Sequence, residues 1–88
     1  MNAIVTVIGQ DRVGIIAAVC NCLAGQQVNI LDISQTIMQN SFTMVMAVDL
    51  SAAESFEKVN GSLKALGEEM CLSIRIQREE IFNAMHSI

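Results

Sequence analysis

The chain has 88 residues, with five basic and nine acidic side chains and a formal net charge of −4 at pH 7. This length fits one domain, residues 1–88, and so small a domain buries only about two-thirds of the surface that its unfolded chain exposes. Because 52% of the residues are hydrophobic and only 16% are charged, we expect apolar surface to remain for an interface. The sequence has no basic cluster, no Trp and no Tyr, which argues against nucleic acid as a partner.

The sequence also argues against a membrane partner and a metal site. No stretch approaches the roughly 20 apolar residues of a membrane span, and the first residues lack the basic region of a targeting segment. Cys20 and Cys22 lie two positions apart in an expected helix, so their side chains diverge by about 200° around its axis. With Cys71 they are interpreted as buried small hydrophobic residues of a protein in the reducing cytoplasm.

A strand is expected at residues 3–9, because this stretch is rich in β-branched residues and apolar on both faces, as in a central strand. A helix is expected from Gly14 to about Gln26. Its apolar face consists of Ile15, Ile16, Val19, Cys22 and Leu23. A stripe of small residues beside that face would let a neighbour approach closely: Gly14, Ala17, Ala18, Asn21 and Gly25.

Two strands are expected next, in a hairpin with a tight turn at residues 39–41. In the first, residues 28–40, the apolar positions change parity, which predicts a bulge near Leu31 and Asp32. The second, residues 42–50, alternates regularly. Its apolar face consists of Phe42, Met44, Met46, Val48 and Leu50.

A second helix is expected after Ser51, which forms a capping box with Glu54, and Gly67 is its expected terminator. Its apolar positions are Phe56, Val59, Leu63 and Leu66. The last strand is expected at residues 71–77, with Leu72, Ile74 and Ile76 on one face. A short amphipathic helix is expected at 78–88, carrying Ile81, Phe82, Met85 and Ile88.

This order of elements predicts an α+β fold, the ferredoxin-like βαββαβ sandwich, because both strand–helix–strand crossovers favour the right-handed form. Its four-stranded antiparallel sheet has two helices on one face, with the first and third strands central. The other face is apolar at Ile4, Ile8 and Val45, so we expect the C-terminal segment or a further dimer to cover it. The second strand is the better edge for pairing, because it has no Lys, Arg or Pro from residue 28 to residue 40.

The loop GQDRVG, residues 9–14, decides between functions of this fold. Metal carriers of this fold have two cysteines here, and RNA binders need more aromatic residues than Phe42 on the central strands. A small phosphatase would use Arg12 and Asn29, but Asp11 would repel a phosphate dianion. The acylphosphatase pattern is not matched, and His86, the only histidine, lies far along the chain from the loop.

An amino acid fits the loop better than a phosphate. The N–H groups of Val13, Gly14 and Ile15 could bind a carboxylate at the start of the helix, and Asp11 could bind the ammonium group. Asn29 is expected at the same end of the sheet, where its amide could bind either group. The simpler alternatives are that Asp11 is only the helix N-cap and that Asn29 only completes a turn.

The stretches VTVIGQDRVGIIAAV (5–19) and QQVNILDISQT (26–36) resemble the ACT domain family of small regulatory modules, and FTMVMAVDL (42–50) and EEIFNAMHSI (79–88) also fit. The chain looks most similar to free-standing ACT proteins related to the glycine cleavage system regulator. The resemblance implies the ferredoxin-like fold, dimers joined through the second strand and first helix, and amino-acid binding at that interface. The ligand positions that it implies are Gly9, Gln10, Asp11, Arg12, Val13, Gly14, Ile15, Asn29 and Ile30.

The expected function is therefore that of a non-catalytic regulator without a cofactor, which binds a small amino acid between two subunits and acts on a protein that the sequence does not identify. A dimer and a tetramer are both open. The alternatives are an assembly module with an empty site and, less favoured, a small phosphatase with the acylphosphatase-like fold.

Overall fold

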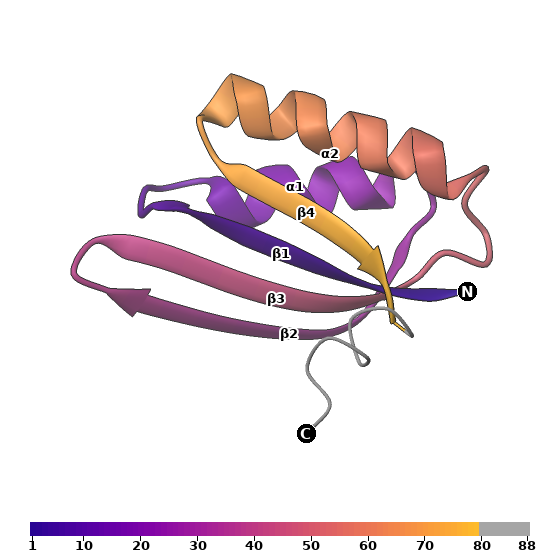
Figure 1. Cartoon of the computed structure of the whole chain (residues 1–88), viewed down its shortest axis with the longest axis horizontal. Coiled ribbons are helices and arrows are strands. Elements are labelled where there is room, and N and C mark those ends of the chain that lie inside the picture. The colour runs from indigo at the N-terminus through magenta and orange to yellow at the C-terminus, as the bar shows by residue number, and fades with distance from the viewer. Residues whose placement is uncertain (80–88) are drawn as a thin grey trace.

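A computed structural model describes residues 1–79 of the chain, and within them it contains the six expected elements in the expected order (Figure 1). They are β1 (Asn2–Gln10), α1 (Ile15–Ala24), β2 (Asn29–Met38), β3 (Ser41–Asp49), α2 (Phe56–Met70) and β4 (Ser73–Arg78). The helix expected at 78–88 lies outside the described residues. No helix within residues 1–79 is long and apolar enough to cross a membrane.

The four strands form one antiparallel sheet in the order β2-β3-β1-β4, so β1 and β3 are central and β2 and β4 are the edges. Both helices lie on the same side of this sheet (Figure 1). The pairing of β2 with β3 shifts register between Ile30 and Asp32. The ferredoxin-like sandwich and the bulge near Leu31 are therefore confirmed.

The core lies between the helices and one face of the central strands. The residues that alternate toward the helices are almost inaccessible to solvent, as the period of two in a strand requires. The strands contribute Ala3, Val5, Val7, Phe42, Met44, Met46 and Val48, and the helices contribute Ile15, Val19, Leu23, Val59 and Leu63. No polar or charged residue of the described chain is buried, so this core is held by apolar packing alone.

Strand β2 lies beyond the cover of the two helices. Ile33 and Ile37 face the helix side of the sheet, because they stand opposite the buried Met46 and Phe42. Yet the exposed fraction is 41% for Ile33 and 54% for Ile37. On α1, the nearby Ile16 is 38% exposed, and most of the small-residue stripe is open to solvent. The apolar surface that the composition predicts therefore lies along β2 and the flank of α1.

The start of α2 differs from the sequence prediction. Ser55 is its N-cap, and the Ser55 hydroxyl accepts a hydrogen bond of 3.1 Å from the backbone N–H of Lys58. Ser51 is unavailable, because its hydroxyl and its N–H both donate to Oδ1 of Asp49, at 2.6 and 2.9 Å. These bonds hold the pKa of Asp49 below its ordinary value. The predicted capping box of Ser51 and Glu54 is therefore wrong.

The end of α2 also differs, because the helix continues through Gly67 to Met70 and stops at Cys71, whose φ is 57°. Gly67 is buried, and a Cβ atom there would lie 2.8 Å from the carbonyl oxygen of Leu72. Gly67 therefore serves the close approach of α2 to the start of β4. Its predicted role as a helix terminator is wrong.

Two glycines of α2 give a matched test of this packing. Gly61→Ala should raise the free energy of unfolding by roughly 0.5–1 kcal/mol, because alanine favours the helix and no atom lies within 4 Å of the added Cβ. Gly67→Ala should lower it by about 1–3 kcal/mol, the usual cost of overpacking. Urea denaturation at one protein concentration measures both, and an equal stabilisation by the two substitutions would contradict the packing of Gly67.

Candidate functional site

The loop between β1 and α1 ends in a glycine that caps the helix. Gly14 is the N-cap of α1 with φ +95°, a left-handed conformation that side chains disfavour. No side chain caps this helix end, so the interpretation of Asp11 as the N-cap is wrong. The first intrahelical bond runs from Ala18 N to Gly14 O, at 2.9 Å. The helix-end donors are therefore the N–H groups of residues 14–17, and the predicted set, Val13 to Ile15, began one residue early.

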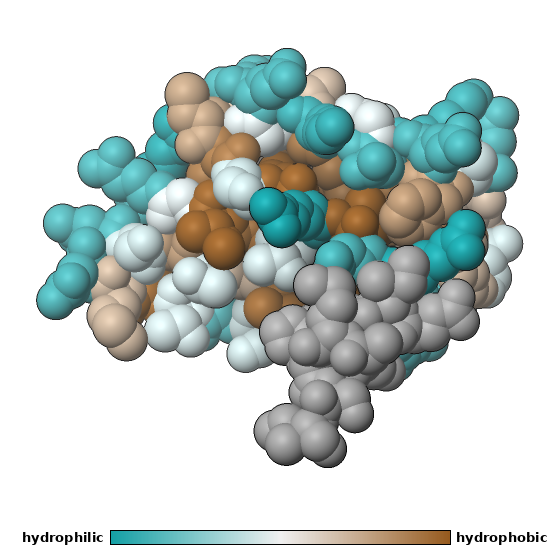
Figure 2. Space-filling view, in the orientation of Figure 1, coloured by the Kyte–Doolittle hydropathy of each residue, from teal (hydrophilic) through white to brown (hydrophobic). Residues whose placement is uncertain are grey.

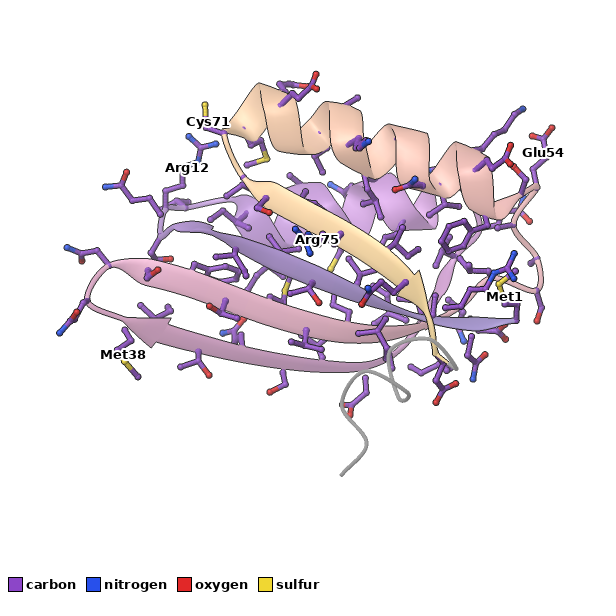
Figure 3. The ribbon with its side chains drawn as sticks, in the orientation of Figure 1. Met1, Arg12, Met38, Glu54, Cys71 and Arg75 are labelled. Atoms are coloured by element: carbon purple, nitrogen blue, oxygen red, sulfur yellow. The ribbon has the colours of Figure 1, made fainter. Side chains whose placement is uncertain are left out.

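The loop is attached at both sides. The backbone N–H of Asp11 donates a 2.8 Å hydrogen bond to the carbonyl of Asn40, in the two-residue turn between β2 and β3. On the other side, the Arg12 guanidinium donates to the carbonyl of Met70, the last residue of α2. Figure 3 shows Arg12 beside Cys71, where α2 ends and β4 begins. The loop is thus fixed between the hairpin and the C-terminus of α2.

These contacts give the two adjacent charged residues different roles. Arg12 satisfies a carbonyl that the helix itself leaves without a partner, and its positive charge suits the negative end of the helix dipole. Asp11 is exposed and takes part in no ion pair within residues 1–79. The Asp11 carboxylate therefore remains available to a cation, whereas Arg12 is engaged.

An open groove of about 430 Å³ runs between the loop, the first turn of α1 and β2. Asp11 borders the groove, the first turn of α1 contributes N–H donors, and the wall toward β2 is mostly apolar. The lining residues are Asp11, Arg12, Val13, Gly14, Ile15, Ile16, Ala17, Gln35, Ile37 and Phe42. Donors for a carboxylate and an acid for an ammonium group thus border one groove, as a zwitterion requires.

The predicted ligand positions do not all lie together. Five of them, residues 11–15, line the groove. The side chain of Ile15 is buried in the core, so Ile15 can offer a ligand only its backbone. Gly9 and Gln10 belong to the end of β1, and they precede the residues that line the groove. A second hollow of about 250 Å³ lies on the other side of the loop, between Gln10 and Met70.

Asn29 and Ile30 lie at the other end of the sheet. Asn29 stands opposite Asp49, which stands opposite Asn2, and the eight residue steps from Asn2 to Gln10 span about 26 Å. The expectation that Asn29 starts its strand beside the loop is therefore wrong. The reason is that α1 carries the chain back along the sheet, so β2 starts where β1 starts.

Sequence reasoning missed the groove wall. Gln35, Ile37 and Phe42 come from the hairpin, and their position beside the loop depends on the pairing of β2 after its bulge. The signal available in the sequence was the shared parity of Ile33 and Ile37 on the expected edge strand, and parity alone does not indicate a site.

The cysteines are free and lie in different surroundings. Cys20 and Cys22 are half-buried and pack against the core, whereas Cys71 is exposed, so the interpretation of all three as buried is wrong for Cys71. Burial raises the pKa of the Cys22 thiol, and a hydrogen bond with Gln26 opposes this shift. Residues 1–79 hold no group of three or more His, Cys, Asp or Glu side chains that could bind a metal ion.

The chain is thus a ferredoxin-like sandwich in which the loop after the first strand ends at a glycine N-cap and borders an open groove. The ACT domain family model matches residues 2–77, and the chain is a member of the ACT domain family. It is 55% identical to a UPF0237 protein of Clostridium acetobutylicum over the full length of both chains.

Solved structures agree with this assignment. The ACT domain protein from Streptococcus pneumoniae superposes with a TM-score of 0.82 at 38% identity and covers 93% of each chain. A putative glycine cleavage system transcriptional repressor superposes with a TM-score of 0.75 at 24% identity over 86% of this chain and 44% of its own. The latter likeness establishes the shared fold.

The cysteine environments predict an order of reactivity. At about pH 8, Cys22 should react with iodoacetamide more slowly than Cys71, because a raised pKa leaves less of the reactive thiolate and burial limits access. Mass spectrometry of peptides from briefly treated protein measures both rates, and unfolding in urea is the control that should equalise them. Equal rates in the folded protein would contradict the packing of Cys22.

Proposed function

We propose that the protein is a non-catalytic, cytoplasmic regulator that binds a small amino acid between two copies of the chain. ACT domains are commonly small-molecule-sensing regulatory domains, and this chain belongs to that family. The observation that supports the proposal is the groove that is bordered both by Asp11 and by the start of α1, a helix end without a side-chain cap.

The charges favour an amino acid over a simple anion. The N–H groups of residues 14–17 and the positive end of α1 suit a carboxylate. A phosphate dianion would meet the same donors but would be repelled by Asp11 at close range. An amino acid presents an ammonium group to Asp11 and a carboxylate to the helix, so both charges are satisfied.

A second copy completes the proposed site. A two-fold axis near the middle of β2 makes the pairing of two β2 edges antiparallel. The start of the partner's β2 then lies beside the end of this β2, which adjoins Asn40 and the loop. In this arrangement the partner's Asn29 and the partner's Ile30 lie beside this subunit's groove. Within one subunit, by contrast, Asn29 and the loop lie at opposite ends of the sheet, about 26 Å apart.

The free edge of β2 supports this pairing. No Lys, Arg or Pro lies between Val28 and Asn40, whereas β4 carries Arg75 and Arg78, and charged side chains protect an edge from pairing. A partner would also cover Ile33 and Ile37, which residues 1–79 leave exposed. These exposed residues equally support the alternative of an assembly module with an empty site.

A phosphatase is the weaker alternative. Its phosphate would need Arg12, but the Arg12 guanidinium already donates to the carbonyl of Met70. Asp11 lies in the middle of the anion cradle, and Asn29 lies at the other end of the same subunit. We therefore assign no catalytic residue.

Asp11→Asn should weaken amino-acid binding about tenfold or more, because the substitution keeps the size of the side chain and removes the charge that the ammonium group requires. A calorimetric titration of the amino acids, after a thermal-shift screen has found one that binds, measures this change. Glu68→Gln on the exposed surface of α2 is the control and should bind as the parent does. Unchanged affinity in Asp11→Asn would remove Asp11 from the site.

Gln35→Lys should convert the dimer to a monomer, because it places a charge in the middle of the β2 edge. Ala65→Lys, on the exposed surface of α2, adds the same charge away from β2 and should leave the dimer intact. Light scattering at tens of micromolar measures both. A parent protein that is monomeric at this concentration would contradict the dimer and the shared site.

A further inference from the structure

The face of the sheet opposite the helices is left open by residues 1–79, and on it a small apolar cluster lies among polar side chains such as Thr6 and Thr43. Ile4 and Ile8 of β1 and Val45 of β3 lie on it, and Ile8 is 46% exposed. Figure 2 looks onto this face and shows hydrophobic surface on both sides of Arg75, which Figure 3 labels in the same orientation. A patch of this kind on a small domain marks a contact surface.

Arg75 is the charged residue within this apolar patch. It stands opposite Thr6, which stands opposite Val45, so it projects on the face that carries Ile4 and Ile8. Arg75 is exposed and forms no ion pair within residues 1–79. A contacting segment should therefore combine apolar residues with an acid.

The chain that follows β4 has this composition. It begins with Glu79 and Glu80, and the apolar residues Ile81, Phe82, Met85 and Ile88 recur at helical spacing. Strand β4 ends at Arg78, opposite Ala3, so the chain leaves the sheet beside Ile4. Arg78 lies over the ring of Phe56, with 5.8 Å between its Cζ atom and the ring centroid, which ties this exit point to α2.

We propose that residues 80–88 dock on this face as an amphipathic helix, with their apolar side chains against Ile4, Ile8 and Val45 and with Glu79 or Glu80 near Arg75. A helix of nine residues is about 13 Å long, and the four residue steps from Ile4 to Ile8 also span about 13 Å. The segment thus matches the patch in length, hydrophobicity and charge. This inference does not depend on the ligand site.

Backbone NMR spectra of the full chain and of a chain ending at Glu79 test the proposal. Removing residues 80–88 should shift the amide signals of Ile4, Thr6 and Val45 and leave those of Val59 and Leu63 in place. The shortened chain should also bind the dye ANS severalfold more strongly, because the apolar cluster of Ile4, Ile8 and Val45 is open to solvent.

A matched pair of substitutions guards against an effect of chain length. Phe82→Asp should reproduce the shifts of the shortened chain, whereas Ser87→Asp, about 200° from the centre of the apolar side of that helix, should not. Unmoved signals on β1 and β3 in the shortened chain would overturn the proposal. Shifts in the full chain that grow with protein concentration would also overturn it, because they would assign the face to a second copy.

Discussion

The structure depends on one constraint, which is that two helices cover only part of a four-stranded sheet. Residues such as Val19 and Leu63 pack on the central strands and bury Met44 and Met46 completely, but β2 lies beyond their reach. Burial of apolar surface contributes roughly 25 cal/mol per Å², so the exposed Ile33 and Ile37 leave a favourable contact unmade. The same gap between α1 and β2 forms the groove, so the exposed apolar residues of β2 and the groove are adjacent.

The loop after β1 joins these two surfaces to the rest of the molecule. Its N–H at Asp11 holds the turn at Asn40, and its Arg12 side chain holds the end of α2. The left-handed conformation of Gly14 leaves the start of α1 without a side-chain cap. A ligand at this helix end would therefore contact a segment that is already fixed to the hairpin and to α2, so little ordering would oppose its binding.

The fold could be predicted from the sequence because apolar residues recur with period two in the strands and with helical spacing in the helices. The bulge was predictable for the same reason, since it reverses the parity between Ile30 and Ile33. The ends of α2 could not be predicted in this way. The Ser51 hydroxyl donates to the Asp49 carboxylate instead of capping the helix, and Gly67 allows the backbone of Leu72 to approach closely. Both contacts form only when the chain folds. The wall of the groove at Gln35 and Ile37 depends on strand register, and the misplacement of Asn29 came from the direction of β2.

The central claim is that each ligand site is built from the loop of one subunit and the start of β2 of the other. Mixing Asp11→Ala and Asn29→Ala proteins after joint unfolding and refolding tests it, because a mixed dimer then has one intact site and one doubly damaged site. The account predicts that neither protein alone binds the amino acid tightly and that the mixture regains high-affinity binding at one site per mixed dimer. A mixture that binds no better than its components would contradict the shared site.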